Sequence, residues 1–164
     1  METDIIYLGD CRDILPRIPA ESVDCVVTDV AYRVNCAGRG TMSGAFVESA
    51  RRGAVFSEND VAIEDYIGEL YRILKPETHC YIFCNNLNLP HFLDAITRRS
   101  GFRFIKSLIW DKCRKISGRY YMGCFEYILF LRKGGDRQIN DCSTPDILRY
   151  PTPRKLEYSG GGGL

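Results

Sequence analysis

The stretch VDCVVTD, residues 23–29, decides the fold class. It is an apolar run closed by an acidic residue, as expected of a strand that ends at a sheet edge. A shorter apolar run at residues 5–8 precedes it and is closed by Gly9-Asp10, and the residues between the runs suit one or two helical turns before Pro19. This strand, turn, helix, strand order predicts an α/β protein.

Downstream of this stretch the sequence predicts two helices and a further strand. The first helix, at residues 60–75, has Asp60 as its N-cap and Pro76 as its stop. Its apolar residues recur at the i, i+3, i+4 spacing of one buried face: Ile63, Tyr66, Ile67, Leu70, Tyr71 and Leu74. A buried strand follows at 81–84. The second helix begins after Asn88, has Pro90 in its first turn, and ends at Gly101.

The last predicted strands are residues 102–110 and 127–131, an antiparallel pair joined by a polar loop. We therefore expect one domain over residues 1–133. Residues 134–164 hold few large apolar residues and end in a glycine run, so they predict an irregular tail or linker. Residues 30–59 are rich in glycine and arginine without periodicity, and we expect 33–58 to be a mobile functional loop.

Composition excludes several classes of protein. The formal net charge is +1, so any binding to nucleic acid requires grouped basic residues. The sequence has neither an apolar run of the roughly 20 residues that a membrane span needs nor a signal-peptide pattern at its first residues. Eight cysteines without a C-x-x-C pair predict reduced, mostly structural thiols and a cytoplasmic location.

Acidic residues follow the first two predicted strands. Asp29 directly follows an apolar run, and Tyr32 lies three residues further on, so the pair is suited to bind an amine and to stack on its ring. Asp10 and Cys11 stand at the end of the first run, where a carboxylate can meet a ligand. Each motif also has a structural interpretation, Asp29 as part of a turn and Asp10 as a helix cap.

A basic and aromatic loop follows Trp110. Its cations are Lys112, Arg114, Lys115 and Arg119, and Tyr120 lies beside the last of them. Such a loop suits phosphates and bases, while a solvated hairpin is the alternative. The sequence suggests no metal site and no Ser/His/Asp triad, since the two histidines lack carboxylates or cysteines at ligand spacing.

Taken in order, these motifs resemble the beta-class DNA amino-methyltransferases, which methylate adenine N6 or cytosine N4. The resemblance covers roughly residues 5–133. It consists of GDC at 9–11, SVD at 22–24, TDVAY at 28–32 in place of T-D-P-P-Y, RILKP at 72–76, WDK at 110–112 and EYIL at 126–129.

The resemblance implies a Rossmann-like methyltransferase sheet, incomplete here, that ends in an antiparallel hairpin. It implies S-adenosylmethionine as cofactor and double-stranded DNA as substrate, with the target base flipped into a pocket. It also implies that residues 33–58 are a mobile loop for target recognition or DNA contact. By match to the family's motifs, Asp29 is expected to hold the exocyclic amine and Tyr32 to stack on the base. Asp10, Cys11 and Asp29 are expected to lie at the cofactor. Aspartate in the first position of the tetrapeptide favours adenine N6 as the target. The resemblance also implies DNA methylation of the kind found in restriction–modification systems.

Two departures from the family pattern keep a second hypothesis open. Val30 and Ala31 replace both prolines of the tetrapeptide, so the local backbone is less constrained. The glycine-rich cofactor motif of the family is missing from this sequence. The alternative function is an inactive or truncated methyltransferase that acts as a DNA-binding or regulatory module. We also expect association with a missing C-terminal half, or a homodimer.

Overall fold

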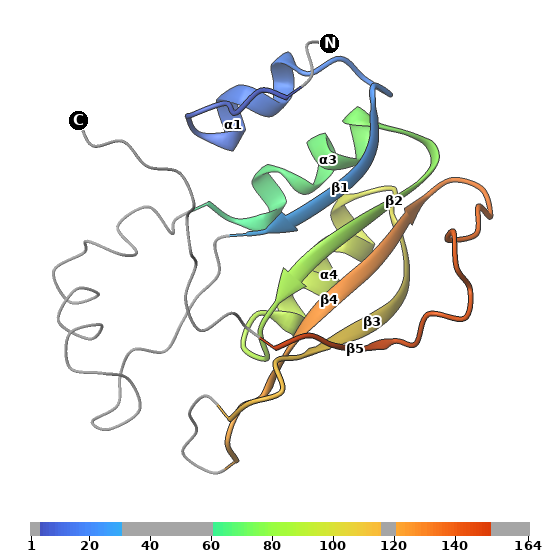
Figure 1. Cartoon of the computed structure of the whole chain (residues 1–164). Coiled ribbons are helices and arrows are strands. Elements are labelled where there is room, and N and C mark those ends of the chain that lie inside the picture. The colour runs from blue at the N-terminus through green and yellow to red at the C-terminus, as the bar shows by residue number, and fades with distance from the viewer. Residues whose placement is uncertain (1–3, 31–60, 116–120, 152–164) are drawn as a thin grey trace, which may run out of the picture.

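The computed structural model describes residues 4–30, 61–115 and 121–151 (Figure 1). Over these residues the strands form a single mixed sheet in the order β1-β2-β4-β3-β5, with helices against it. In chain order the elements are α1 (Cys11–Ile14), the 3-10 turn η1 (Leu15–Arg17), β1 (Val23–Asp29), the 3-10 turn η2 (Ile63–Asp65), α3 (Ile67–Ile73), β2 (Leu74–Cys84), α4 (Leu89–Arg99), β3 (Arg103–Asp111), β4 (Phe125–Lys133) and β5 (Ile147–Arg149).

The sheet combines parallel and antiparallel pairs. Strand β1 runs parallel to β2, while β4 runs antiparallel to both β2 and β3, so β1, β2 and β3 share one direction. The predicted antiparallel hairpin is therefore present as β3 and β4. The predicted α/β class is confirmed.

One face of the sheet is covered by α3 and α4, which lie behind it in Figure 1. Alternate residues of β2 and β4 point into this layer, because side chains of a strand alternate between the two faces. Cys80, Ile82, Leu129 and Leu131 are each completely buried there. The predicted apolar stripe of the first helix supplies the opposing surface, and Ile63, Ile67 and Leu70 are all buried in the same core.

The helix boundaries differ from the sequence prediction in ways that have clear causes. Helix α3 ends at Ile73 rather than at residue 75, because proline disfavours helical geometry in the residue before it, Lys75. Pro76 thereby falls inside β2, which begins seven residues before the predicted start at residue 81. Helix α4 ends at Arg99, and a Cβ at Gly101 would stand 2.5 Å from the Cζ of Tyr71, so this glycine allows close packing.

The predicted first strand at residues 5–8 is wrong. This segment makes no strand pairing, and Ile6 and Leu8 are 96% and 102% exposed. An extended segment is stable in a sheet only beside a partner, and among the described residues β1 pairs on one side alone, with β2. Beyond Gly134, where the sequence predicted no regular element, the three-residue strand β5 pairs in parallel with β3.

The opening motifs of the resemblance fix the start of β1 to the helical layer. Lys75 Nζ lies 2.6 Å from Asp24 Oδ1, and the Ser22 amide donates to the Ile73 carbonyl at 2.9 Å. Arg72 donates to the Leu15 carbonyl at 2.9 Å, which ties the segment after α1 to α3. In the structure, these residues of SVD and RILKP hold chain segments together.

All seven cysteines of the described residues are free, and the most buried, Cys80 and Cys84, lie in the core. Burial raises the pKa of both thiols, so they stay protonated and act as apolar groups. Within the described ranges, the helices are all too short or too polar to cross a membrane.

Candidate active site

The carboxyl ends of β1, β2 and β3 meet at one edge of the sheet, because the three strands run in the same direction. Ligand sites of open α/β sheets lie at such edges. Asp29 is the last residue of β1, and Asp111 is the last residue of β3. The structure therefore places Asp29 where sequence reasoning expected chemistry.

The strand register shows which side chains share the face opposite the helices. Asp29 pairs with Phe83 across β1 and β2, and Phe83 pairs with Ile128 across β2 and β4. Glu126 lies two residues before Ile128 and pairs with Trp110. Directly paired residues, and residues two apart, project on the same side of a sheet. We call this surface, with Asp29, Phe83, Trp110, Lys112 and Glu126, the open-face cluster.

Contacts within the open-face cluster fix its members. Lys112 Nζ forms an ion pair with Glu126 Oε1 and stands 4.8 Å from the centre of the Trp110 ring. The Trp110 ring meets Phe83 edge-on at 5.9 Å between ring centres, and its Nε1 donates to the Tyr150 carbonyl at 2.8 Å. The cluster thus joins two carboxylates, one ammonium group and two aromatic rings at the sheet edge.

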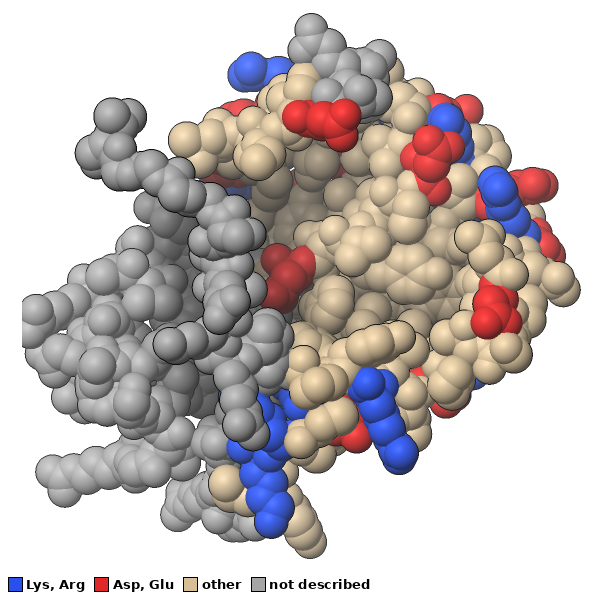
Figure 2. Space-filling model, in the orientation of Figure 1, with Lys and Arg blue, Asp and Glu red and all other residues tan. Residues whose placement is uncertain are grey.

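Asp29 remains accessible while its surroundings perturb it. Partial burial raises the pKa of Asp29 above its ordinary value, Glu126 raises it further, and Lys112 lowers it. Figure 2 shows this side of the molecule as a hollowed and mostly uncharged surface, with an acidic side chain in the hollow and both acidic and basic side chains around its rim. A carboxylate in such a place is a hydrogen-bond acceptor for an amine or a cation.

Asp10 caps a helix, which the sequence analysis gave as the alternative to a ligand-binding role. Its carboxylate accepts the Arg12 amide at 2.8 Å and caps α1, and it also forms an ion pair with the Arg12 side chain at 2.7 Å. These hydrogen bonds from Arg12 lower the pKa of Asp10. Cofactor contact by Asp10 stays a prediction, and it would have to share the carboxylate with Arg12.

Cys11 lies beside a polar group that the sequence analysis missed. Tyr66 is 5% exposed, and its hydroxyl is buried without a hydrogen-bond partner among the described residues. Burial raises the pKa of Tyr66, and Cys11 and Cys84 lie near enough to raise it further. Helical spacing marked Tyr66 as a core residue, and the sequence carried no signal that its hydroxyl would be unpaired.

The predicted DNA-binding cations fall into two groups. Arg114 and Lys115 are exposed beyond the end of β3, as a phosphate contact requires. The Lys112 side chain is only 12% exposed and is paired with Glu126, a placement that argues against contact with phosphates. Arg119, Tyr120, the stacking residue Tyr32 and the loop at 33–58 lie outside the described residues.

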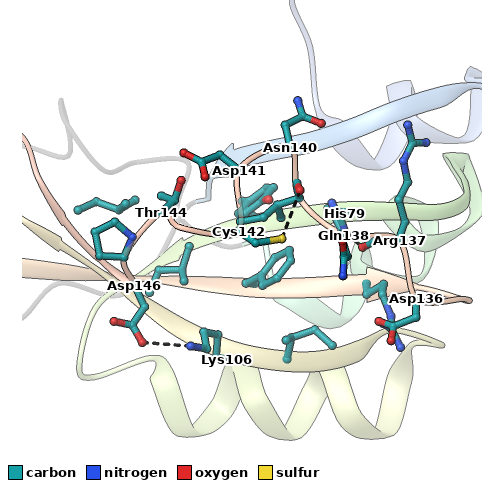
Figure 3. A pocket seen from close by; sticks show the side chains of 18 residues that line it. His79, Lys106, Asp136, Arg137, Gln138, Asn140, Asp141, Cys142, Thr144 and Asp146 are labelled. Carbon is teal, nitrogen blue, oxygen red and sulfur yellow. Dashed lines mark hydrogen bonds and ion pairs between the residues drawn. The ribbon is translucent and has the colours of Figure 1, made fainter.

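A second hollow, of about 810 Å³, lies on the open face between the sheet and the segment that leads to β5. Figure 3 shows His79 and Lys106 on the sheet side, with Asn140 and Asp141 on the covering segment and α4 on the far side of the sheet. Lys106 binds Asp146 at 3.1 Å, and His79 Nε2 contacts the Arg137 carbonyl at 3.0 Å. These polar groups are satisfied within the protein, so this hollow is the weaker candidate.

No cluster of three or more potential metal ligands (histidine, cysteine, aspartate or glutamate) occurs among the residues that the structure describes. His91 Nε2 does approach Glu64 Oε1, at 3.3 Å, but this pair is partly exposed and stands alone.

The comparisons place the chain in a family. The model of the DNA methylase family matches residues 23–158, which is most of the chain, and the chain belongs to this family. A curated relative, the DNA adenine methyltransferase YhdJ of Escherichia coli, is 28% identical over 137 residues. That match covers 80% of this chain but 42% of YhdJ, so the chain spans less than half of this relative.

Solved structures share the fold at low sequence identity. A DNA modification methylase of Thermus thermophilus, TTHA0409, in complex with S-adenosylmethionine, is 18% identical with a TM-score of 0.56 over 89% of this chain and 66% of that one. The cytosine-N4-specific PvuII DNA methyltransferase is 12% identical with a TM-score of 0.60, and the match covers 93% of this chain and 58% of that one. At these identities, the likeness shows the fold.

Proposed function

We propose that this chain is the catalytic half of an S-adenosylmethionine-dependent DNA methyltransferase that modifies an exocyclic base amine, with adenine N6 as its preferred target. The observation that carries the proposal is the place of Asp29 at the shared carboxyl edge of the sheet, on the face that holds Phe83 and Trp110. Membership of the DNA methylase family supports the reaction class.

The proposed chemistry depends on holding the target nitrogen. An ionised Asp29 accepts a hydrogen bond from the amine of a flipped base and orients its lone pair, while Tyr32 stacks on the ring. Positioning of this kind contributes most of the rate of an in-line transfer. Arg114, Lys115 and Arg119 then bind phosphates of the duplex around the target.

The cofactor fits the charge of the site. S-adenosylmethionine carries a sulfonium and an ammonium group and supplies the methyl group when bound. Asp29 and Glu126 are two carboxylates against one lysine in the open-face cluster, so the local charge favours a cation. We therefore propose Asp10, Cys11 and Asp29 as the described residues nearest the cofactor.

The choice of adenine rests on Asp29 and on the relative. YhdJ is a DNA adenine methyltransferase, whereas the PvuII enzyme is specific for cytosine N4. Aspartate at the first tetrapeptide position favours the former target. Product analysis decides between them, because N6-methyladenine and N4-methylcytosine separate after digestion to nucleosides.

A second candidate function is a DNA-binding or regulatory module without activity. Val30 takes the place of a family proline and packs against the core beyond Asp29, and Arg12 already occupies the Asp10 carboxylate. Both observations favour weak cofactor binding. We expect the isolated chain to fold and to show little transfer until a C-terminal half or a second copy completes it.

The experiment follows labelled methyl groups from S-adenosylmethionine into duplex DNA. It uses the chain alone and the chain supplied with the C-terminal half of a relative in trans. Transfer that depends on Asp29 supports the enzyme. DNA binding with neither cofactor binding nor transfer in either setting supports the regulatory module and contradicts our proposal.

A further inference from the structure

Contacts on several sides hold Lys112 in a position where its charge faces the open-face cluster instead of solvent. Its Nζ is paired with Glu126 and stands over the Trp110 ring, and its backbone amide donates to the Cys124 carbonyl at 2.8 Å. The side chains of Lys112 and Glu126 are 12% and 22% exposed. The ion pair and the ring hold the ammonium group, and the hydrogen bond holds the backbone of Lys112, so the charge has a fixed and partly desolvated place.

Glu126 lies on the same face of the sheet as Asp29. Both residues project from the face opposite the helices, one at the end of β1 and the other near the start of β4. Two carboxylates that share a partly buried site disfavour each other's ionised form, and a nearby cation offsets that effect. Glu126 and Lys112 are the charged groups that act on Asp29 among the described residues.

We propose that Lys112 is a positioning residue for the proposed methyl transfer: its ion pair with Glu126 balances the negative charge that faces Asp29 and leaves the Asp29 carboxylate ionised and free to bind the target amine. This role rests on the proposed function of Asp29. It assigns Lys112 to the chemistry of the site, and it gives the ion pair a purpose other than stability.

The geometry explains why an ion pair, and not a lysine without a partner, is needed near Asp29. An unpaired lysine next to Asp29 would bind that carboxylate itself and compete with the amine. Glu126 and the Trp110 ring hold the ammonium group back, so that its field reaches Asp29 while its hydrogen bonds go elsewhere. The pair therefore tunes Asp29 without occupying it.

The test measures the titration of the Asp29 carboxyl carbon by NMR in the whole 164-residue chain, with the signal assigned by its loss in Asp29→Asn. In Lys112→Met, Glu126 is left unbalanced, and we expect Asp29 to titrate at higher pH than in the parent. In Glu126→Gln, Lys112 is released, and we expect Asp29 to titrate at lower pH. The double variant should fall between the two single variants, and Lys112→Arg should stay close to the parent.

The matched control is Lys106→Met. Lys106 lies on the same strand as Trp110 and pairs with Asp146 at 3.1 Å, but it is six residues from Lys112 along the chain. Lys106 is not among the charged groups that act on Asp29. The Asp29 titration should be unchanged in this variant.

Opposite shifts in Lys112→Met and Glu126→Gln support the role, because a general loosening of the fold cannot produce both signs. An Asp29 titration in Lys112→Met at or below that of the parent overturns it. If Lys112→Met fails to fold, Glu126→Gln decides alone, and the absence of a downward shift overturns the proposal.

A second readout is the pH profile of methyl transfer, with Lys112→Met moving its acidic limb to higher pH and Lys112→Arg restoring it. The two proposals fail separately. Normal transfer by Asp29→Ala contradicts the proposed function while the titration result stands. Unaltered titration curves contradict the positioning role even where Asp29→Ala abolishes transfer.

Discussion

The two faces of the sheet have opposite chemistry. The helix-covered face is closed and apolar, with Ile82 and Leu129 completely buried between the strands and the helices. The open face carries Asp29 and Glu126 at its carboxyl edge and remains accessible. Strand alternation therefore separates the residues that stabilise the fold from those that carry the proposed chemistry, so that neighbouring residues of one strand serve different purposes.

The largest effect that sharpens this contrast is on stability. Truncation of Leu129 to alanine on the closed face should lower the free energy of unfolding by about 2–5 kcal/mol, because it leaves a cavity in a close-packed layer. Urea unfolding followed by circular dichroism measures it. The control is Val27→Ala on the open face, where the side chain is 66% exposed and the cost should stay within about 0.5 kcal/mol. Equal losses in the two variants would contradict the division between the faces.

A second prediction concerns close packing beside the closed face. Gly101→Ala puts a methyl group against the Tyr71 ring, which itself meets Phe102 edge-on at 5.1 Å. The clash should cost about 1–3 kcal/mol. Thermal unfolding gives the value, and adding Tyr71→Leu should recover part of the loss. A neutral Gly101→Ala variant would show that the ring moves aside freely.

We expect the exposed cations after β3 and the paired Lys112 to differ in their effect on the salt dependence of DNA binding. Removing the exposed Arg114 or Lys115 should lower the slope of log affinity against log salt by about 1 each. Removing Lys112, which is paired with Glu126, should leave the slope unchanged. Binding titrations of duplex DNA across a salt series measure this. A slope change in Lys112→Met as large as in Arg114→Ala would return Lys112 to the phosphate contacts.

The smallest predicted effect is the pH dependence that Asp29 adds to stability. Because its pKa is raised in the folded protein, its contribution is most favourable below the ordinary pKa and falls as pH rises through the folded value. Asp29→Asn should therefore raise stability at neutral pH, by at most a few tenths of a kcal/mol, because solvent screens an accessible carboxylate. Chemical unfolding at acidic and neutral pH tests the sign. A loss of stability at neutral pH in Asp29→Asn would contradict the raised pKa.

Sequence periodicity predicted the closed face correctly and the first strand wrongly. The i, i+3, i+4 stripe of Ile63, Ile67 and Leu70 identified the core, because a helix shows its buried face within a few residues of chain. The run at residues 5–8 looked equally strand-like and pairs with nothing among the described residues. Strand formation depends on a partner that one segment cannot reveal.

The candidate site was predictable in part for the same reason. The acidic end of β1 marked Asp29 from the sequence. The ion pair between Lys112 and Glu126 joins residues fourteen positions apart and depends on the register of β3 against β4. That register is set by long-range packing, so the loop composition alone suggested a phosphate contact for Lys112.

We propose that the open-face end of β1 carries the chemistry, and two substitutions on this strand separate that role from a structural one. Asp29 ends β1, and Asp24, near its start, pairs with Lys75 at 2.6 Å. The measurement is the rate of methyl transfer to duplex DNA by Asp29→Asn and by Asp24→Asn, each supplied with the same completing half. We predict a loss of about 100-fold or more for Asp29→Asn, as for removal of a group that orients the reacting atom, and near-parental transfer for Asp24→Asn. Equal rates for the two variants would contradict the proposed role of Asp29.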